Sequence, residues 1–263
     1  MNTYSLKRGL VEDRHALPDP RLTAYHTRMV MELVSLLYRN VSQEANQEVK
    51  KFIAARFQQY PPQPMTKEQA ALHEAGHYIA FEAEGMIATT AEIHGSAGGR
   101  KGWGGIAYAA ERPMYNAQPI TPGKLISEAR AAIAGPWAEF SLGGGDFSDS
   151  ISEIIEVHFL AACAAERLGC RRHQVLDHIV VGTAATVNAH RTGIEKIAEL
   201  LGNQKRIFRN PSIRSVLKSA ATTPVSDLHP APQRHIDELG ELLTGAVPGI
   251  DELILQVTTG RAA

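Results

Sequence analysis

The sequence has few of the features that mark secreted, membrane-embedded or nucleic-acid-binding proteins. Its 263 residues include only two cysteines, Cys163 and Cys170, and these belong to no C-x-x-C pair. Neither a disulfide framework nor a cysteine metal site is therefore expected. The net charge is -1, with 27 basic and 28 acidic residues, so no overall positive field favours nucleic acid.

Long apolar runs are missing as well. No stretch reaches the roughly 18 consecutive apolar residues of a membrane-spanning helix, because the longest candidate, residues 157–165, is short and contains His158. Residues 1–13 lack the apolar region of a secretory signal. These absences predict a chain without a membrane span, in a reducing, cytoplasmic setting.

What the chain does have is an ordinary globular composition. Hydrophobic residues make up 44% of the sequence and charged residues 21%, enough to build a substantial core. We expect a mostly α (α+β) fold in three segments. These are a helical N-terminal segment with a proline-rich linker (1–64), a main domain (65–220), and a linker followed by a C-terminal helix (221–263).

Two helix starts carry the spacing of a capping box. Thr66 is followed by Gln69, and Ser150 by Glu153, each three residues on. The first helix should run to about Glu84, ahead of Gly85. Further helices are predicted at 22–58, 124–142, 173–203, 211–220 and 233–244, and strands at 87–94 and 106–109 around a glycine-rich turn at 95–105.

The most informative motif is His73-Glu74-Ala75-Gly76-His77. Residues four apart lie on one face of a helix, so His73 and His77 can both offer a ring nitrogen to one Zn²⁺ ion. Glu74 lies beside the first ligand and can act as the general base toward water. Gly76 costs the helix about 1 kcal/mol relative to alanine, which makes sense if another element packs closely against it.

A catalytic zinc site usually takes a third protein ligand. The downstream candidates are His94, Glu128, Glu139, Asp146, Asp149, Glu153 and His158. Asp149 is our choice, because it follows a glycine-rich turn and precedes a helix, where a short carboxylate can be aimed at another helix. The ordinary alternative is that Asp149 merely caps that helix. Asp146, three residues earlier, is the other candidate for the same role.

Residues 71–153 resemble the peptidase domain of the FtsH-type zinc proteases. The resemblance is carried by Ala71-Leu72-His73-Glu74-Ala75-Gly76-His77, by the strand–turn–strand, by the helical run 132–139, and by Ser148-Asp149 at the next helix start. It implies a zincin-like helical peptidase domain with a small β-sheet or hairpin. It also implies that Asp149 is the third zinc ligand and that Glu139 orients a ligand histidine.

The sequence also departs from that family. Pro136 and Trp137 replace Arg and Ala, and the Thr-Gly-Ala run before the family's Asn-Asp is absent. No phosphate-binding G-x-x-x-x-G-K-[ST] motif is present, since residues 98–102 have the wrong spacing. We therefore expect no ATPase module in this chain. The enzyme would cleave flexible or unfolded polypeptides directly, or receive them from a separate ATPase or adaptor.

The predicted strands give a place for substrate. A peptide could add a strand to the edge at 87–94 or at 106–109. His94, at the end of the first strand, could contact substrate, although an ordinary exposed histidine is the simpler interpretation, and the loop 95–105 could act as a lid. A homo-oligomer is compatible with the sequence. The competing hypotheses are a catalytically silent zinc-binding or scaffold protein that keeps the fold, and a metal hydrolase acting on a small substrate.

Overall fold

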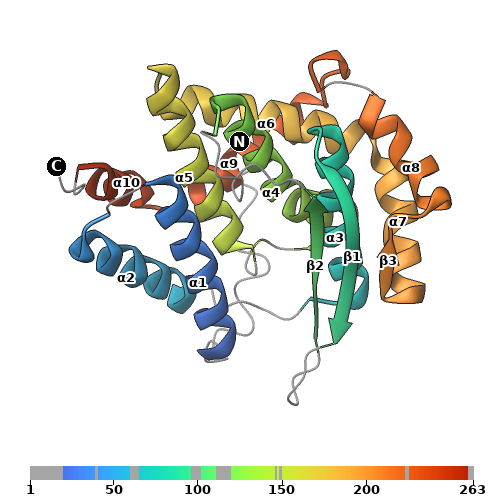
Figure 1. Ribbon diagram of the computed structural model, residues 1–263, viewed down its shortest axis with the longest axis horizontal. Helices are drawn as coiled ribbons and strands as arrows, with labels where there is room; N and C mark the ends of the chain where they lie inside the picture. The colour runs from blue at the N-terminus through green and yellow to red at the C-terminus, as the bar shows by residue number, and fades with distance from the viewer. Residues whose placement is uncertain are drawn as a thin grey trace.

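The computed structural model describes residues 20–38, 41–59, 65–95, 102–110, 120–145, 147, 150–222 and 225–259. Within these ranges helices predominate and a single small antiparallel sheet accompanies them (Figure 1). The predicted mostly α (α+β) class is confirmed. No helix in the described part of the chain is both long and apolar enough to cross a membrane.

Helix α3 (Lys67–Ala83) carries the histidine motif. Its predicted capping box is confirmed: the Thr66 hydroxyl accepts from the Gln69 N–H at 3.1 Å, and the Gln69 side chain accepts from the Thr66 N–H at 2.8 Å. The chain leaves the helix at Gly85, whose φ of 77° suits glycine. α3 packs against α4 (Pro122–Gly143), α7 (Arg191–Gln204) and the sheet, so most of its surface is buried.

The sheet has three antiparallel strands in the order β2-β1-β3. They are β1 (Ile87–Gly95), β2 (Trp103–Ala110) and the short β3 (Arg206–Phe208), which the sequence did not predict. β1 pairs with β2 along its length and with β3 at residues 90–92, so its middle is not a free edge. Within the described ranges, β2 is an edge strand whose outer side meets only one bridge, from Met65 to Trp103.

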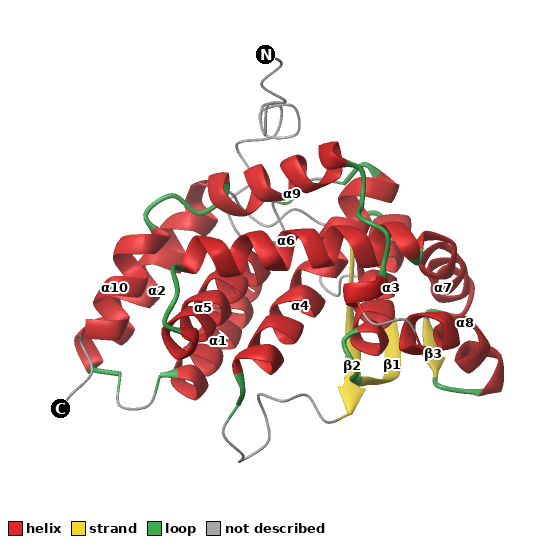
Figure 2. Cartoon of the chain, turned by 90° about the horizontal axis from the view of Figure 1, so that it is seen from above, coloured by secondary structure: helices red, strands yellow, loops and turns green. Residues whose placement is uncertain are grey.

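In the other half of the molecule, the elements that the structure describes are helices. α5 (Ile151–Leu168) packs against α1 (Pro20–Leu37), α2 (Gln43–Gln59) and α10 (Ile250–Thr259), which lie together in Figure 1. α6 (Arg172–Ala189) and α9 (Gln233–Gly245) run side by side over the core in Figure 2, while α8 (Pro211–Thr222) contacts α3 and α7.

Several details differ from the sequence predictions, and the helical run expected at 22–58 is divided into α1 and α2. The helix expected at 173–203 is interrupted at His190, which separates α6 from α7, and α10 was not predicted. Ser150 is the N-cap of α5 but makes no side-chain capping bond, so the second capping box is wrong. Glu153, its partner in that pattern, is directed toward α3.

One hydrophobic cluster joins the three segments expected from the sequence. It includes Val30 and Phe57 from the N-terminal segment, Ile79 and Ile155 from the main domain, and Val257 from the C-terminal helix. Cys163 is buried in α5 and Cys170 is exposed just after it, and neither forms a disulfide, as expected. The N- and C-terminal helices therefore share the core that surrounds the motif helix.

Candidate metal centre

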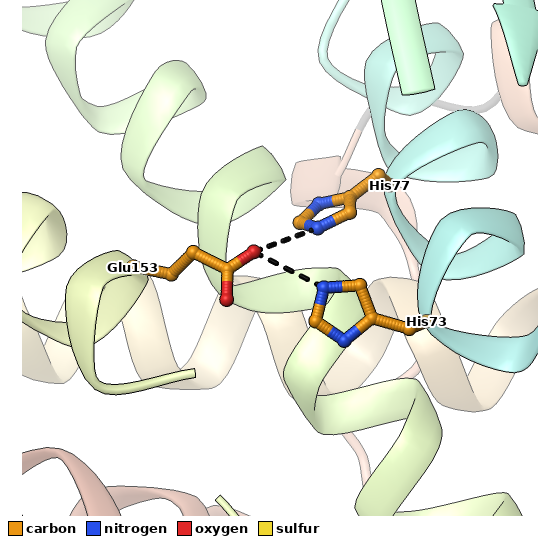
Figure 3. Close-up of side chains that lie close together, drawn as sticks. All are labelled: His73, His77 and Glu153. Carbon is orange, nitrogen blue, oxygen red and sulfur yellow. Dashed lines mark hydrogen bonds and ion pairs between the residues drawn. The ribbon is translucent and has the colours of Figure 1, made fainter. Parts of the chain in front are cut away.

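Three side chains from two helices meet beside α3 (Figure 3). The Nε2 atoms of His73 and His77, both on α3, lie 3.1 Å from the same carboxylate oxygen, Oε1 of Glu153 on α5. The three candidate ligand atoms lie within 4.8 Å of one another. Residues far apart in the sequence thus place two nitrogens and one oxygen around a single point.

Close packing against α4 fixes the position of the motif helix. A Cβ added at Gly76 would lie 2.6 Å from the Ala134 carbonyl oxygen and 2.7 Å from the Ala138 Cβ, so only glycine fits. This confirms the expectation that another element approaches the helix at this glycine. On the facing side, a Cβ added at Gly135 would overlap the His77 ring at Nε2. The two glycines thereby leave room for the helices and for the imidazole.

The second nitrogen of each histidine is also engaged. His73 Nδ1 lies 3.1 Å from Glu139 Oε2, and His77 Nδ1 lies 2.8 Å from the Ala131 carbonyl oxygen. A carbonyl can only accept, so His77 Nδ1 carries a proton and donates it. Such contacts fix the tautomer and the ring orientation of a metal-binding histidine, leaving Nε2 for the ion.

This arrangement attracts positive charge to the point between the three side chains. If both imidazoles are neutral with the proton on Nδ1, two Nε2 lone pairs face the Glu153 carboxylate. The repulsion is relieved by a proton or by a metal cation. A divalent ion would satisfy all three groups at once.

The pKa shifts of His73 and Glu153 also indicate that positive charge is favoured between these side chains. Burial by itself lowers the pKa of His73, but the Glu153, Glu139 and Glu74 carboxylates together hold it well above its usual value. Burial raises the pKa of Glu153, yet its charge interactions and hydrogen bonds with His73 and His77 hold it well below its usual value. Each group is therefore stabilised in its charged form.

Glu74, the residue after the first histidine, is only 3% exposed. Burial raises the pKa of its carboxyl to about 6, while His73 and His77 act in the opposite direction. The adjacent edge strand comes very close, because a Cβ added at Gly105 would lie 2.5 Å from Glu74 Cγ. The sequence assigned Gly105 to a loop, whereas it lies within β2, where the missing side chain makes space for this carboxylate.

The preferred third ligand of the sequence analysis is not among the residues whose positions are described. Asp149 and Asp146 both lie outside the described residues. Among the described residues, the carboxylate that faces both Nε2 atoms belongs to Glu153, one of the other candidates, in the first turn of α5. We had assigned Glu153 to a capping box, and its spacing from Ser150 gave no sign that it would turn toward α3.

The remaining candidates fall in other places. His94 is exposed and alternates along β1 with the buried Ile93, so its side chain lies on the sheet face away from α3. His158 is buried farther along α5, where its Nε2 donates to the Leu243 carbonyl oxygen. Glu128 is buried in α4. Among the described residues, the only group of three or more potential metal ligands is His73, His77 and Glu153.

Pro136 and Trp137, the two residues that depart from the FtsH-type pattern, both lie within α4. Pro136 lies inside this helix without ending it. Trp137 is buried and its ring stacks on Phe140, with His235 of α9 against its edge. The helix therefore keeps Glu139 in place beside His73 despite the proline.

Comparison with known proteins adds no relative: no protein-family model matches the sequence, and no curated protein matches it either.

The donor set fits zinc on its own chemistry. Two imidazole nitrogens and one carboxylate oxygen form one of the usual catalytic zinc sets, with one position left open. Atoms bound tetrahedrally at about 2.0–2.2 Å are roughly 3.3–3.6 Å apart. The two N···O separations of 3.1 Å are close to that range.

Proposed function

We propose that this protein is a zinc-dependent endopeptidase. The proposal depends chiefly on one observation, the meeting of His73 Nε2, His77 Nε2 and Glu153 Oε1 beside the buried Glu74. His73, His77 and Glu153 would hold the ion, and Glu139 would orient His73 through its Nδ1. This proposed set has Glu153 in the place of Asp149, the third ligand of our sequence-based prediction, which lies outside the described residues.

When bound, zinc would supply polarisation of a carbonyl oxygen and a lowered pKa for water. The chain itself supplies the proton transfers. Glu74, with its pKa near 6, is ionised at neutral pH and suited to take a proton from the attacking water. The same carboxyl would then return that proton to the leaving amine.

The substrate would be an extended segment of a flexible or unfolded polypeptide. Among the described residues, the outer edge of β2 is met only by the bridge from Met65 to Trp103, so such a segment could add a strand there. Gly105 on this strand lies directly against Glu74. The alternative edge at 87–94 is unsuitable in its middle, because β3 already pairs there. Membership of the FtsH-type peptidases, delivery by a separate ATPase or adaptor, and a cytoplasmic location remain parts of this proposal.

The decisive experiment replaces Glu74 and keeps the metal ligands. Purified Glu74→Gln protein should bind zinc like the wild type but cleave casein or a peptide about 10²–10⁴-fold more slowly, because it has lost the general base. Glu68→Gln, an exposed residue on the same helix, is the matched control and should cleave normally. Unchanged cleavage by Glu74→Gln would sink the mechanism.

Metal analysis distinguishes the candidates for the third ligand. Glu153→Ala should lose most of its bound zinc, whereas Asp149→Ala and Asp146→Ala should retain it. A protein that keeps its zinc as Glu153→Ala but loses it as Asp149→Ala would restore the earlier assignment.

The competing functions give different results in the same assays. A scaffold protein would bind zinc without cleaving any peptide, and replacing Glu74 would change nothing. A hydrolase of small substrates would fail on casein yet depend on Glu74. The burial of Glu74 beside the candidate ligands favours a catalytic function, because a purely structural zinc site does not need that carboxylate.

A further inference from the structure

The helix that carries Glu153 is in contact with the N-terminal segment. α1 packs across α5, as Figure 1 shows, and brings His26 to its first turn. His26 Nδ1 lies 2.8 Å from the hydroxyl of Ser152, the residue just before Glu153. Ser152 is only 1% exposed, so the Ser152 side of this part-buried hydrogen bond is shielded from water.

The start of α5 has no side-chain cap of its own. Its N-cap residue, Ser150, makes no side-chain capping bond, and its hydroxyl oxygen is buried without a hydrogen-bond partner among the described residues. The bond from Ser152 to His26 therefore ties this turn to a different helix. This bond lies in the same helical turn as Glu153 and therefore fixes the backbone that carries the Glu153 side chain.

His26 is suited to accept this bond. Burial lowers the pKa of His26 from its usual value, the Glu153 carboxylate raises it, and His73 lowers it further. The net lowering favours the neutral ring at pH 7, whose Nδ1 can accept the proton of the Ser152 hydroxyl. The ring is held by Phe57 of α2 and by Tyr25, with centroids 5.7 Å and 5.4 Å away.

We propose that His26 is a positioning residue for the third metal ligand: through its hydrogen bond to Ser152, α1 holds the first turn of α5 so that Glu153 reaches His73 and His77. The proposal depends on the metal site of the proposed function but not on peptide cleavage. The N-terminal segment would thereby help to orient a metal ligand that belongs to the main domain (65–220).

Two substitutions at His26 separate the hydrogen bond from packing. His26→Phe keeps an aromatic ring against Phe57 and Tyr25 but cannot accept the bond. His26→Asn loses the ring but keeps an acceptor near the position of Nδ1. Zinc affinity is measured by competition with a chromophoric chelator, on variants shown to be folded by circular dichroism.

We expect zinc affinity to fall about ten-fold in His26→Phe and in Ser152→Ala, and to stay within about two-fold of wild type in His26→Asn. The double variant His26→Phe with Ser152→Ala should be no weaker than either single one, because both remove the same bond. Tyr25→Phe, one residue away on α1, serves as control and should bind zinc normally.

The opposite order overturns the inference. If His26→Phe binds zinc like the wild type while His26→Asn is impaired, the ring matters only for packing. The two proposals also fail separately: a wild type that binds zinc with the predicted variant pattern but cleaves no peptide removes the peptidase function alone. A wild type that binds and cleaves, with His26→Phe unchanged, removes only the role of His26.

Discussion

On one side of the metal centre, α3 and α4 approach each other through glycine and alanine. On the other side, α5 meets α1 through large rings and buried polar side chains. Gly76 lies against Ala134 and Ala138, whereas Tyr38 lies edge-on to Phe159 with ring centroids 6.1 Å apart. The histidines lie on α3 at the first interface, and Glu153 reaches them from α5, the helix that the second interface supports.

The difference shows how each ligand is held. Where backbones are in contact, the histidine positions follow from the distance between two helices, and any added atom disturbs them. Where side chains separate the helices, the Glu153 position depends on a few hydrogen bonds and on ring packing. The second interface should therefore lose more stability on truncation, and the first should react more sharply to added volume.

The largest expected effect on stability comes from Phe159→Ala. Phe159 is fully buried at the α1–α5 interface, so its truncation should lower the free energy of unfolding by about 3–5 kcal/mol. Urea denaturation measures this loss. Leu168→Ala, on the same helix but 52% exposed, should change stability by less than about 0.5 kcal/mol. If Phe159→Ala lowered the free energy of unfolding by less than about 1 kcal/mol, buried aromatic rings would not be what stabilises this interface.

Acidification should weaken the same half of the molecule through His158. Its Nε2 donates to the Leu243 carbonyl oxygen at 2.8 Å, and its Nδ1 accepts from Arg172 at 2.6 Å, so the neutral ring is satisfied. Burial lowers the pKa of His158 to about 4; the bond to Leu243 opposes this and Arg172 adds to it.

The sign of the effect follows from proton binding. Between about pH 6.5 and pH 4 the unfolded chain binds a proton at His158 that the folded chain does not. The stabilising contribution is complete above this window and is lost as the pH falls, by up to about 3 kcal/mol. Urea denaturation across the window should show a shallower slope in His158→Gln, and the wild-type slope in His229→Gln, which replaces an exposed histidine.

A smaller but more specific effect is expected from Gly135→Ala. The added methyl would overlap the His77 ring, so we expect a loss of about 1–3 kcal/mol in unfolding free energy together with weaker zinc binding. Gly202→Ala in α7, with nothing within 4 Å of the new methyl, should instead gain up to about 1 kcal/mol. Equal responses of these two helical glycines would mean that the α3–α4 contact is looser than described.

The smallest effect concerns a single hydroxyl. Tyr38 donates to the Phe159 carbonyl oxygen at 3.2 Å, and Tyr38→Phe should cost about 1 kcal/mol. Tyr25→Phe, 41% exposed on α1, should change stability by less than about 0.5 kcal/mol. Thermal unfolding resolves the difference, and indistinguishable variants would show that this buried bond contributes nothing net.

Two similar sequence patterns had different outcomes in this fold. Thr66 with Gln69 and Ser150 with Glu153 have the same spacing, and only the first pair forms a capping box. The Gln69 side chain accepts a hydrogen bond from the Thr66 backbone N–H, whereas the Glu153 carboxylate lies beside the imidazoles of His73 and His77. Nothing in the local sequence around Glu153 indicates this contact. Likewise, β3 is only three residues long and forms a strand because β1 lies beside it.

The sequence by itself determined the helix that carries His73, Glu74 and His77, because cap spacing and the 3.6-residue turn are local properties. It also indicated through Gly76 that another element packs closely there. Only the tertiary structure brought Glu153, 80 residues from His73 in the chain, to the two histidines. Distances between helices depend on the packing of the whole core, and spacing along the sequence does not encode them.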